Sequence, residues 1–258
     1  MIFLATAIAV VVFIGVVFGI SVRLGKYDTI DTAWGLGFGV IALVALALSY
    51  GDGPNALRIT VTALTVVWGV RLGVHLHIRN HDKPEDRRYV AIQSRAKGNP
   101  RLHMLRVVFL TQGVLMWIIS LPVQVAQTGS AEFHALAWVG VALWVFGFAF
   151  ETIGDAQLTR FKADPASKGK VLDTGLWRYT RHPNYFGDAC VWWGLYLMAC
   201  HSWWGAATVV APLIMTYLLA KGTGKPLTEK HLSSSRPGYA DYVARTSGFF
   251  PLPPKGNR

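Results

Sequence analysis

Long runs of apolar residues recur along the whole sequence and are separated by polar segments. A helix needs about 20 predominantly apolar residues to cross hydrocarbon about 30 Å thick, and several of these runs approach or exceed that length. We expect transmembrane helices over seven ranges: Ile2–Val22, Ala33–Tyr50, Ile59–Ile78, Val107–Val125, Phe133–Phe150, Tyr185–Cys200 and Trp203–Ala220. The pattern predicts an all-α polytopic integral membrane protein, a seven-transmembrane helix bundle.

The first apolar run has two possible interpretations. A signal peptide would have Lys or Arg before the apolar stretch and a small-residue cleavage site after it, and Ile2–Val22 shows neither feature. We therefore interpret it as a retained span. Short connections, as at His201–Ser202, favour antiparallel neighbouring helices within a single membrane domain over residues 1–258.

Positive charges are distributed unevenly between the connections. The segments after spans one, three, five and seven hold two, eight, six and seven Lys or Arg residues, together 23. The other three connections hold one, Arg58. Because cytoplasmic segments of membrane proteins carry an excess of Lys and Arg, this distribution predicts an N-terminus outside and a cytoplasmic C-terminus.

The composition agrees with a membrane protein. Only 15% of the 258 residues are charged, whereas a soluble domain carries roughly a quarter. Sorting of positive charge explains the net charge of +11 without a nucleic-acid partner, although an anionic phosphate ligand would also account for part of it.

The usual sequence motifs for nucleotides, metals and redox chemistry are missing. There is no G-x-G-x-x-G between a strand and a helix, no Walker loop, no HExxH and no CxxC. Cys190 and Cys200 match no zinc or redox spacing, so we predict no metal site and favour a buried structural role for both. The glycines of Gly35-Leu36-Gly37-Phe38-Gly39 are interpreted as helix packing. Any cofactor must therefore lie within the helical bundle.

Ionisable residues inside spans are functional candidates, because each is costly there unless it is paired or hydrated. Asp28 and Asp31 stand at the start of the second span, where the alternative is that they cap its N-terminus. Arg71 lies in the third span and needs an acceptor, for which Asp31 is a plausible partner; alternatively Arg71 extends to the interface. The mixed charges of Glu85–Tyr89 are, taken alone, typical of a solvated face.

Two carboxylates end the fifth span. Glu151 and Asp155 are four residues apart and so share one helical face. That face is either a water-facing tip or part of a polar cavity. The segment that follows supplies four cations, Arg160, Lys162, Lys168 and Lys170.

The densest polar cluster lies at the start of the sixth span. Pro183 suits the first turn of a helix, and Asn184 and Asp188 then share one face. Basic and aromatic side chains gather beside this helix N-terminus, whose free N–H groups attract anions: Arg178, Tyr179, Arg181, His182 and Tyr185. Ordinary residues of the membrane interface would explain these side chains but not Asn184 and Asp188. We therefore expect a ligand site here.

The C-terminal tail has a helical pattern of its own. Tyr239, Tyr242 and Arg245 recur at helical spacing, with His231 and Arg236 upstream. The tail is either an amphipathic helix on the membrane surface or a lid over the basic end of the sixth span.

The segment Arg181-His182-Pro183-Asn184-Tyr185-Phe186-Gly187-Asp188, followed by Tyr239, Tyr242 and Pro251, resembles the C-terminal half of the membrane steroid 5α-reductases. The whole chain looks like a bacterial homologue of that family, specifically from about Glu151 to Pro251 and weakly over the first 130 residues. The resemblance implies seven helices of the bacterial inner membrane enclosing NADPH, which reduces the C4–C5 double bond of a 3-oxo-4-ene steroid or similar lipid enone. It divides the chain into substrate-side helices over 1–130 and a cofactor-binding half over 131–258. The implied partners are a lipid or steroid substrate and membrane lipids, for a protein acting as a monomer.

The resemblance and the polar clusters together give the candidate NADPH-binding residues. Lys162 and Lys170 fall where the family has phosphate-binding arginines, and Asp188 replaces a Glu of the animal enzymes. The full set is Asp155, Lys162, Lys170, Arg178, Tyr179, Arg181, His182, Asn184, Tyr185, Asp188, His231, Arg236, Tyr239, Tyr242 and Arg245.

The candidate catalytic residues lie in the N-terminal half. The animal enzymes polarise the steroid ketone with a Glu at the start of span two, which Asp31 matches, and a Tyr near the end of span three, where this chain has Trp68. Because an indole has no hydroxyl, Arg71 and Tyr89 are alternatives to the Trp68 N–H. Donors in a dry pocket would stabilise the enolate that forms as hydride adds to the β-carbon, and burial would favour a protonated Asp31.

Two other classes of protein remain. The isoprenylcysteine carboxyl methyltransferases, which use S-adenosylmethionine, share the Arg-His-Pro-x-Tyr start of the motif and a basic, aromatic tail. The Asp after Gly187 and the seven spans favour the reductase. A non-catalytic lipid-binding or scaffolding membrane protein is the third possibility.

Overall fold

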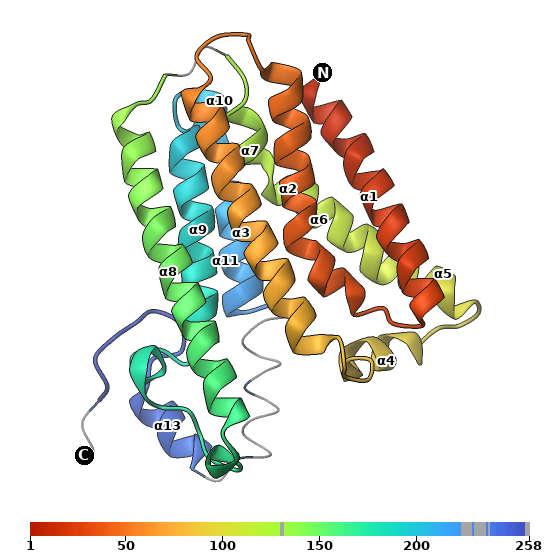
Figure 1. Ribbon diagram of the computed structural model, residues 1–258, viewed down its shortest axis with the longest axis vertical. Helices are drawn as coiled ribbons and strands as arrows, with labels where there is room; N and C mark the ends of the chain where they lie inside the picture. Colours follow the sequence, from red (N-terminus) through yellow and green to blue (C-terminus); the bar gives the residue numbers. More distant parts are fainter. Residues whose placement is uncertain (130–131, 223–228, 230–235, 237, 256–258) are drawn as a thin grey trace. The chain divides into compact units, whose positions relative to one another are not determined.

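The computed structural model describes residues 1–129, 132–222, 229, 236 and 238–255. Every regular element in these residues is a helix, and an isolated bridge pairs Thr180 with Ser247. The helices are shown in Figure 1: α1 Ile2–Leu24, α2 Thr29–Ser49, α3 Ala56–Asn80, α4 Arg87–Gln93, α5 Pro100–Met104, the π-helix η1 Leu105–Leu110, α6 Thr111–Ile119, α7 Leu121–Val125, α8 Ala135–Ala163, the 3₁₀ turns η2 Pro165–Ser167 and η3 Gly175–Arg178, α9 Pro183–Ala199, α10 Trp203–Ala207, α11 Val210–Ala220 and α13 Tyr239–Arg245. The predicted all-α fold is confirmed for the described residues.

Within the described residues, six helical stretches are long and apolar enough to cross a membrane: Ile2–Leu24, Thr29–Ser49, Ala56–Asn80, Pro100–Ile119, Ala135–Ala163 and Trp203–Ala220. The predicted number of seven is not confirmed. The stretch expected as the sixth span is α9, which has 17 residues and so is about 26 Å long at 1.5 Å per residue. That length is at the lower limit for crossing the hydrocarbon.

The chain folds as two compact units. Unit 1 comprises Met1–Ala137 and Met198–Thr208, and unit 2 comprises Trp138–Leu197 and Val209–Arg258. The first change of unit lies between Ala137 and Trp138, and residues 198–208 return to unit 1.

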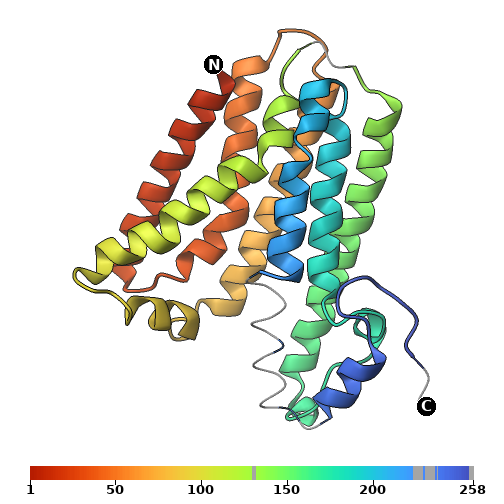
Figure 2. The ribbon, with the colours of Figure 1, turned by 180° about the vertical axis from the view of Figure 1, so that it is seen from behind.

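Glycines set the helix packing in unit 1. A Cβ atom on Gly35 of α2 would lie 2.6 Å from the carbonyl oxygen of Gly69 on α3, so the two backbones touch at this point. A Cβ on Gly37 would overlap the side chain of Met116 on α6. The helix α6 runs obliquely across α1 and α2 in the reversed view of Figure 2. The interpretation of these glycines as helix packing is confirmed. Their consequence is that the start of α2 and the end of α3 are held close together.

A second series of glycines joins α8 to α9 in unit 2. A Cβ on Gly147 of α8 would lie 2.6 Å from the carbonyl oxygen of Gly187, and one on Gly194 would lie 2.6 Å from that of Gly140. Because the close contacts pair early α8 with late α9, the two helices are antiparallel. The seven-residue spacings put these glycines on one face of each helix. This packing face was not recognised in the sequence.

Arg58, the one positive charge expected outside, is buried with 1% of its surface exposed. Its guanidinium donates hydrogen bonds to the backbone carbonyls of Ser49, Asp52 and Gly129. Ser49 is the last residue of α2, so Arg58 satisfies the negative end of that helix. The charge therefore stabilises a helix end and does not lie on a solvated loop.

Candidate functional site

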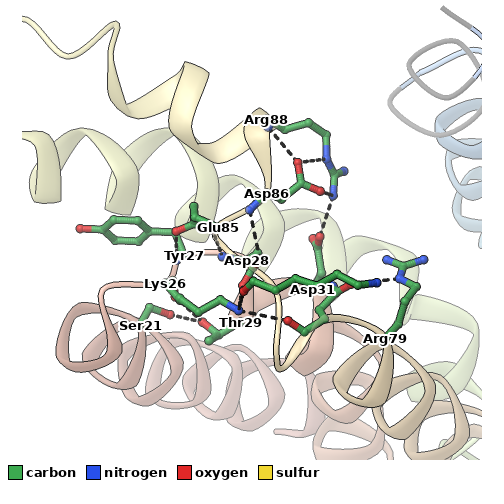
Figure 3. A network of polar contacts seen from close by, with 12 residues as sticks. Ser21, Lys26, Tyr27, Asp28, Thr29, Asp31, Arg79, Glu85, Asp86 and Arg88 are labelled. Atoms are coloured by element: carbon green, nitrogen blue, oxygen red, sulfur yellow. Dashed lines mark hydrogen bonds and ion pairs between the residues drawn. The ribbon is translucent and has the colours of Figure 1, made fainter. Parts of the chain in front are cut away.

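A partly buried hydrogen bond joins two of the predicted catalytic residues. The Tyr89 hydroxyl on α4 donates to Asp31 Oδ1 near the start of α2 over 2.5 Å. Arg88 contacts the other oxygen, Asp31 Oδ2, at 2.8 Å and also binds Asp86 at 3.0 Å (Figure 3). A third helix also contacts the pair: Gln112 Nε2 on α6 donates to the Tyr89 hydroxyl oxygen over 3.5 Å. Three helices that are distant in sequence thus meet around one phenol–carboxylate pair.

Burial and the neighbouring charges act on the protonation of both members of this pair. Burial raises the pKa of the Tyr89 phenol, and the negative charge of Asp31 raises it further. Tyr89 therefore remains protonated at neutral pH. The guanidinium of Arg88 favours the ionised form of Asp31, whereas burial acts in the opposite direction and favours the protonated form considered from the sequence. In the hydrogen bond between the two side chains, the Tyr89 hydroxyl is the donor and Asp31 the acceptor.

The segment before α4 turns toward α2 and is not a solvated loop. Glu85 accepts backbone hydrogen bonds from Tyr27 at 2.5 Å and Asp28 at 2.9 Å. In return, Asp28 Oδ2 accepts from the backbone N–H of Asp86 at 3.3 Å (Figure 3). The interpretation of 85–89 as a solvated face is therefore wrong, because these carboxylates satisfy backbone N–H groups of another connection.

The expected capping roles are also revised. Asp28 occupies the N-cap position of α2, but its side chain makes no capping hydrogen bond there. It is 4% exposed, and its carboxylate is directed to Asp86 and, at 3.8 Å, to Lys26. Capping by Asp28 is therefore wrong because its oxygens are committed to a tertiary contact.

The other two predicted catalytic residues lie on α3. Trp68 is fully buried and packs edge-to-face on Phe38, with ring centroids 5.8 Å apart. Arg71 lies one helical turn further on and is half-buried. The structure thus brings Asp31 and Tyr89 together directly, whereas Trp68 is part of the packed core between α2 and α3.

Unit 2 contains a second buried polar pair. Asn184 Nδ2 on α9 donates to Asp155 Oδ1 on α8 over 3.0 Å. Asp155 is 6% exposed and Glu151 is 2% exposed, so the interpretation of this face as a water-facing tip is wrong. Gly154 allows this close approach of the two helices, because a Cβ there would lie 3.2 Å from the backbone nitrogen of Asn184. Among the described residues, Asn184 Oδ1 is buried without a hydrogen-bond partner.

Arg181 and His182 share a partner that the sequence did not reveal. Glu229 Oε1 lies 2.7 Å from Arg181 Nε and 3.2 Å from His182 Nε2. Arg181 also donates to the backbone carbonyls of Val243 and Thr246. Burial acts to raise the pKa of Glu229, but the hydrogen bonds from His182 and Arg181 more than offset it and lower the pKa to about 2. Arg181 is thus engaged within the protein.

The tail packs on the segment before α9. Tyr242 on α13 donates its hydroxyl hydrogen to the carbonyl of Trp177 over 2.6 Å, and Trp177 Nε1 in turn donates to Gly154 at 3.1 Å. Tyr239 and Tyr242 are each 3% exposed. The tail is therefore packed against the basic segment, in agreement with the expected lid and not with an amphipathic helix that contacts only the membrane surface.

The remaining cofactor candidates divide by exposure. Arg245 pairs with Asp173, and Arg236 donates to the carbonyl of Lys170 over 3.0 Å. Tyr185 stacks on the His182 ring with centroids 5.2 Å apart. Four of the candidate residues are exposed: Lys162, Lys170, Arg178 and Tyr179. Asp188 on α9 is half-buried. His231 lies outside the described residues.

Unit 1 contains a cavity of about 640 Å³, lined by Thr128, Gly129, Glu132, His134, Cys200, His201, Ser202 and Trp204. The rings of His134 and His201 are 6.3 Å apart. Burial lowers the pKa of His201, and His134 lowers it further. Within the described part of the chain, no three His, Cys, Asp or Glu side chains converge in a way that would hold a metal ion.

Comparison with known proteins assigns the chain to a family. The described residues are helical, with six candidate membrane spans and polar pairs between helices. Residues 17–246 match the family described as "Protein of unknown function (DUF1295)". The chain belongs to this family. An uncharacterized protein of Schizosaccharomyces pombe is 25% identical to it, over 92% of this chain and 76% of the relative. No solved structure matches the chain.

Proposed function

We propose that this protein is an NADPH-dependent membrane oxidoreductase that reduces the C4–C5 double bond of 3-oxo-4-ene steroids, or the double bond of a similar lipid enone. The observation that carries the proposal is the partly buried hydrogen bond between Tyr89 and Asp31. The resemblance of the Arg181–Asp188 segment to the steroid 5α-reductases supports it independently.

The chemistry requires a donor for the ketone oxygen. When hydride adds to the β-carbon of an enone, the electron pair of the double bond moves onto that oxygen, and a hydrogen bond there stabilises the enolate. Tyr89 is protonated and supplies this donor by turning its O–H from Asp31 to the ketone. Arg88 keeps the Asp31 carboxylate paired meanwhile. The α-carbon then takes a proton from water or from a nearby acid.

The residues of unit 2 fit part of an NADPH site. Asn184 Oδ1 is a buried acceptor with no partner among the described residues, and a nicotinamide carboxamide would satisfy it. Lys162, Lys170 and Arg178 are exposed cations that suit phosphates. When bound, NADPH would supply the hydride. Arg181, Arg236 and Tyr242 hold parts of unit 2 together and are assigned no phosphate contact.

The test uses the purified full chain in detergent or nanodiscs. With NADPH and a panel of 3-oxo-4-ene steroids and lipid enones, we expect oxidation of NADPH and a product two hydrogens heavier. Tyr89→Phe keeps the ring and removes the donor, so kcat should fall about a hundredfold or more. Tyr50→Phe is the matched control, because Tyr50 is exposed beyond the other end of α2.

Two outcomes would overturn the proposal. The first is full turnover by Tyr89→Phe with Tyr50→Phe also unaffected. The second is binding of S-adenosylmethionine with no affinity for NADPH, which would favour a methyltransferase of the isoprenylcysteine carboxyl type.

A further inference from the structure

Two polar connections of unit 1 exchange backbone hydrogen bonds in both directions. Glu85 takes the N–H groups of Tyr27 and Asp28, and the Asp28 carboxylate takes the N–H group of Asp86. We call these contacts the carboxylate clasp. Figure 3 shows that the clasp joins the turn between α1 and α2 to the segment between α3 and α4.

The clasp has a regular relation to the Tyr89–Asp31 pair. Asp28 precedes Asp31 by three residues, and Asp86 precedes Tyr89 by three residues. Each pair is separated by about one helical turn. The bond between Asp28 and Asp86 therefore sets the positions at which α2 and α4 begin, and so sets the distance between the two functional side chains.

We propose that Glu85 is a positioning residue, whose carboxylate holds the start of α2 and the start of α4 in the register at which Tyr89 reaches Asp31. This inference rests on the proposed function of that pair. Glu85 touches neither Tyr89 nor Asp31 through any contact seen here, so it acts through the backbone.

The geometry distinguishes Glu85 from the neighbouring charges. Its two oxygens accept from two consecutive N–H groups, which fixes both the position and the orientation of the turn. Lys26 also joins the two connections, by donating to the carbonyls of Asn80 and Lys83. Those carbonyls belong to residues that precede the clasp, so these bonds do not reach the segment from residue 85 to Tyr89.

The test reads the Tyr89–Asp31 contact without any substrate. 3-Fluorotyrosine is incorporated at position 89 of the full chain, and its ¹⁹F resonance is recorded in detergent. Asp31→Asn defines the shift that follows loss of the carboxyl acceptor. Glu85→Gln should move the resonance toward the Asp31→Asn value or broaden it, because an amide retains one acceptor and presents an N–H₂ to the other N–H group. Asp82→Asn is the matched control, since Asp82 is an exposed carboxylate in the same segment.

Each outcome decides the inference. A Glu85→Gln resonance identical to that of the unmodified chain, while Asp31→Asn shifts it, overturns the positioning role. So does an equal shift from Asp82→Asn. If the Gln variant fails to fold, Glu85→Asp serves in its place, and a contact preserved despite the shorter side chain has the same meaning.

Activity measurements keep the two proposals separate. If the chain reduces enones, Glu85→Gln should lower kcat between about tenfold and a hundredfold and leave the Kd for NADPH unchanged. A ¹⁹F shift without enone reduction by the unmodified chain would contradict the reductase and retain the positioning role. Reduction that Glu85→Gln does not impair would contradict the positioning role alone.

Discussion

Asn184 donates a hydrogen bond to Asp155 over 3.0 Å, and its own carbonyl oxygen is buried without a partner among the described residues. Replacing Asn184 with Ala leaves the buried Asp155 without this donor, which costs about 1–3 kcal/mol of stability. It also removes the acceptor proposed for the nicotinamide. We expect Asn184→Ala to weaken NADPH and NADH alike, measured by fluorescence titration. A loss confined to NADPH would contradict this placement.

The glycine contacts between α8 and α9 predict a stability effect. Gly147→Ala places a Cβ 2.6 Å from the Gly187 carbonyl, and overpacking of this kind costs about 1–3 kcal/mol. We expect a lower melting temperature in detergent. Gly15→Ala is the control, because a Cβ at Gly15 of α1 meets no atom within 4 Å and should raise stability slightly. Equal effects of the two substitutions would show that helix propensity alone is being measured.

The preference between the two nicotinamide cofactors tests the cations after α8. The 2′-phosphate of NADPH carries nearly two negative charges, and one charge-assisted contact contributes about 1.5–3 kcal/mol. Replacing both Lys162 and Lys170 with Ala should therefore weaken NADPH binding by at least tenfold and leave NADH nearly unchanged. Lys97→Ala, an exposed cation of unit 1, is the control. If the preference for NADPH over NADH is unchanged, the contact with the 2′-phosphate is assigned to Arg178 instead.

Glu229 predicts a pH dependence of stability. Its pKa lies at about 2, below the ordinary value near 4.5, so its contribution is complete above about pH 4.5 and is lost as the pH falls toward 2. By about pH 3 most of this contribution should be lost. Glu229→Gln should flatten this part of the melting curve, whereas Asp241→Asn, an exposed carboxylate on α13, should keep it. Parallel curves for the wild type and Glu229→Gln would contradict the ion pair with Arg181.

The charge distribution predicts the orientation in the membrane. The 23 positive charges of the connections after spans one, three, five and seven should be cytoplasmic. A reporter fused after Arg258 should therefore report the cytoplasm, and one fused before Met1 should report the outside. Because Arg58 is buried against carbonyls, Arg58→Ala should lower stability without inverting the topology. A C-terminal reporter outside would contradict the seven-span arrangement.

The sequence by itself determined the helices. Long apolar runs must satisfy their backbone groups internally in hydrocarbon, so the runs at 2–22, 33–50 and 59–78 could become nothing but helices, and the structure places α1, α2 and α3 there. Local spacing also identified Gly35 and Gly37 as packing positions and put Glu151 and Asp155 on one helical face. These features depend only on the 3.6-residue period of a single helix, so they can be recognised in the sequence.

Tertiary structure decided the partners. Arg88 and Tyr89 lie 57 and 58 residues from Asp31, and Glu229 lies 48 residues from Arg181. Spacing along the chain cannot identify such pairs, because they depend on the path of the connections between helices. For the same reason the sequence suggested a ligand as the partner of Arg181, Arg245 and Tyr242. In the folded protein Arg181 pairs with Glu229, Arg245 pairs with Asp173, and Tyr242 donates to the Trp177 carbonyl. A buried polar group must find a partner inside the protein, and only the folded chain determines which one is within reach.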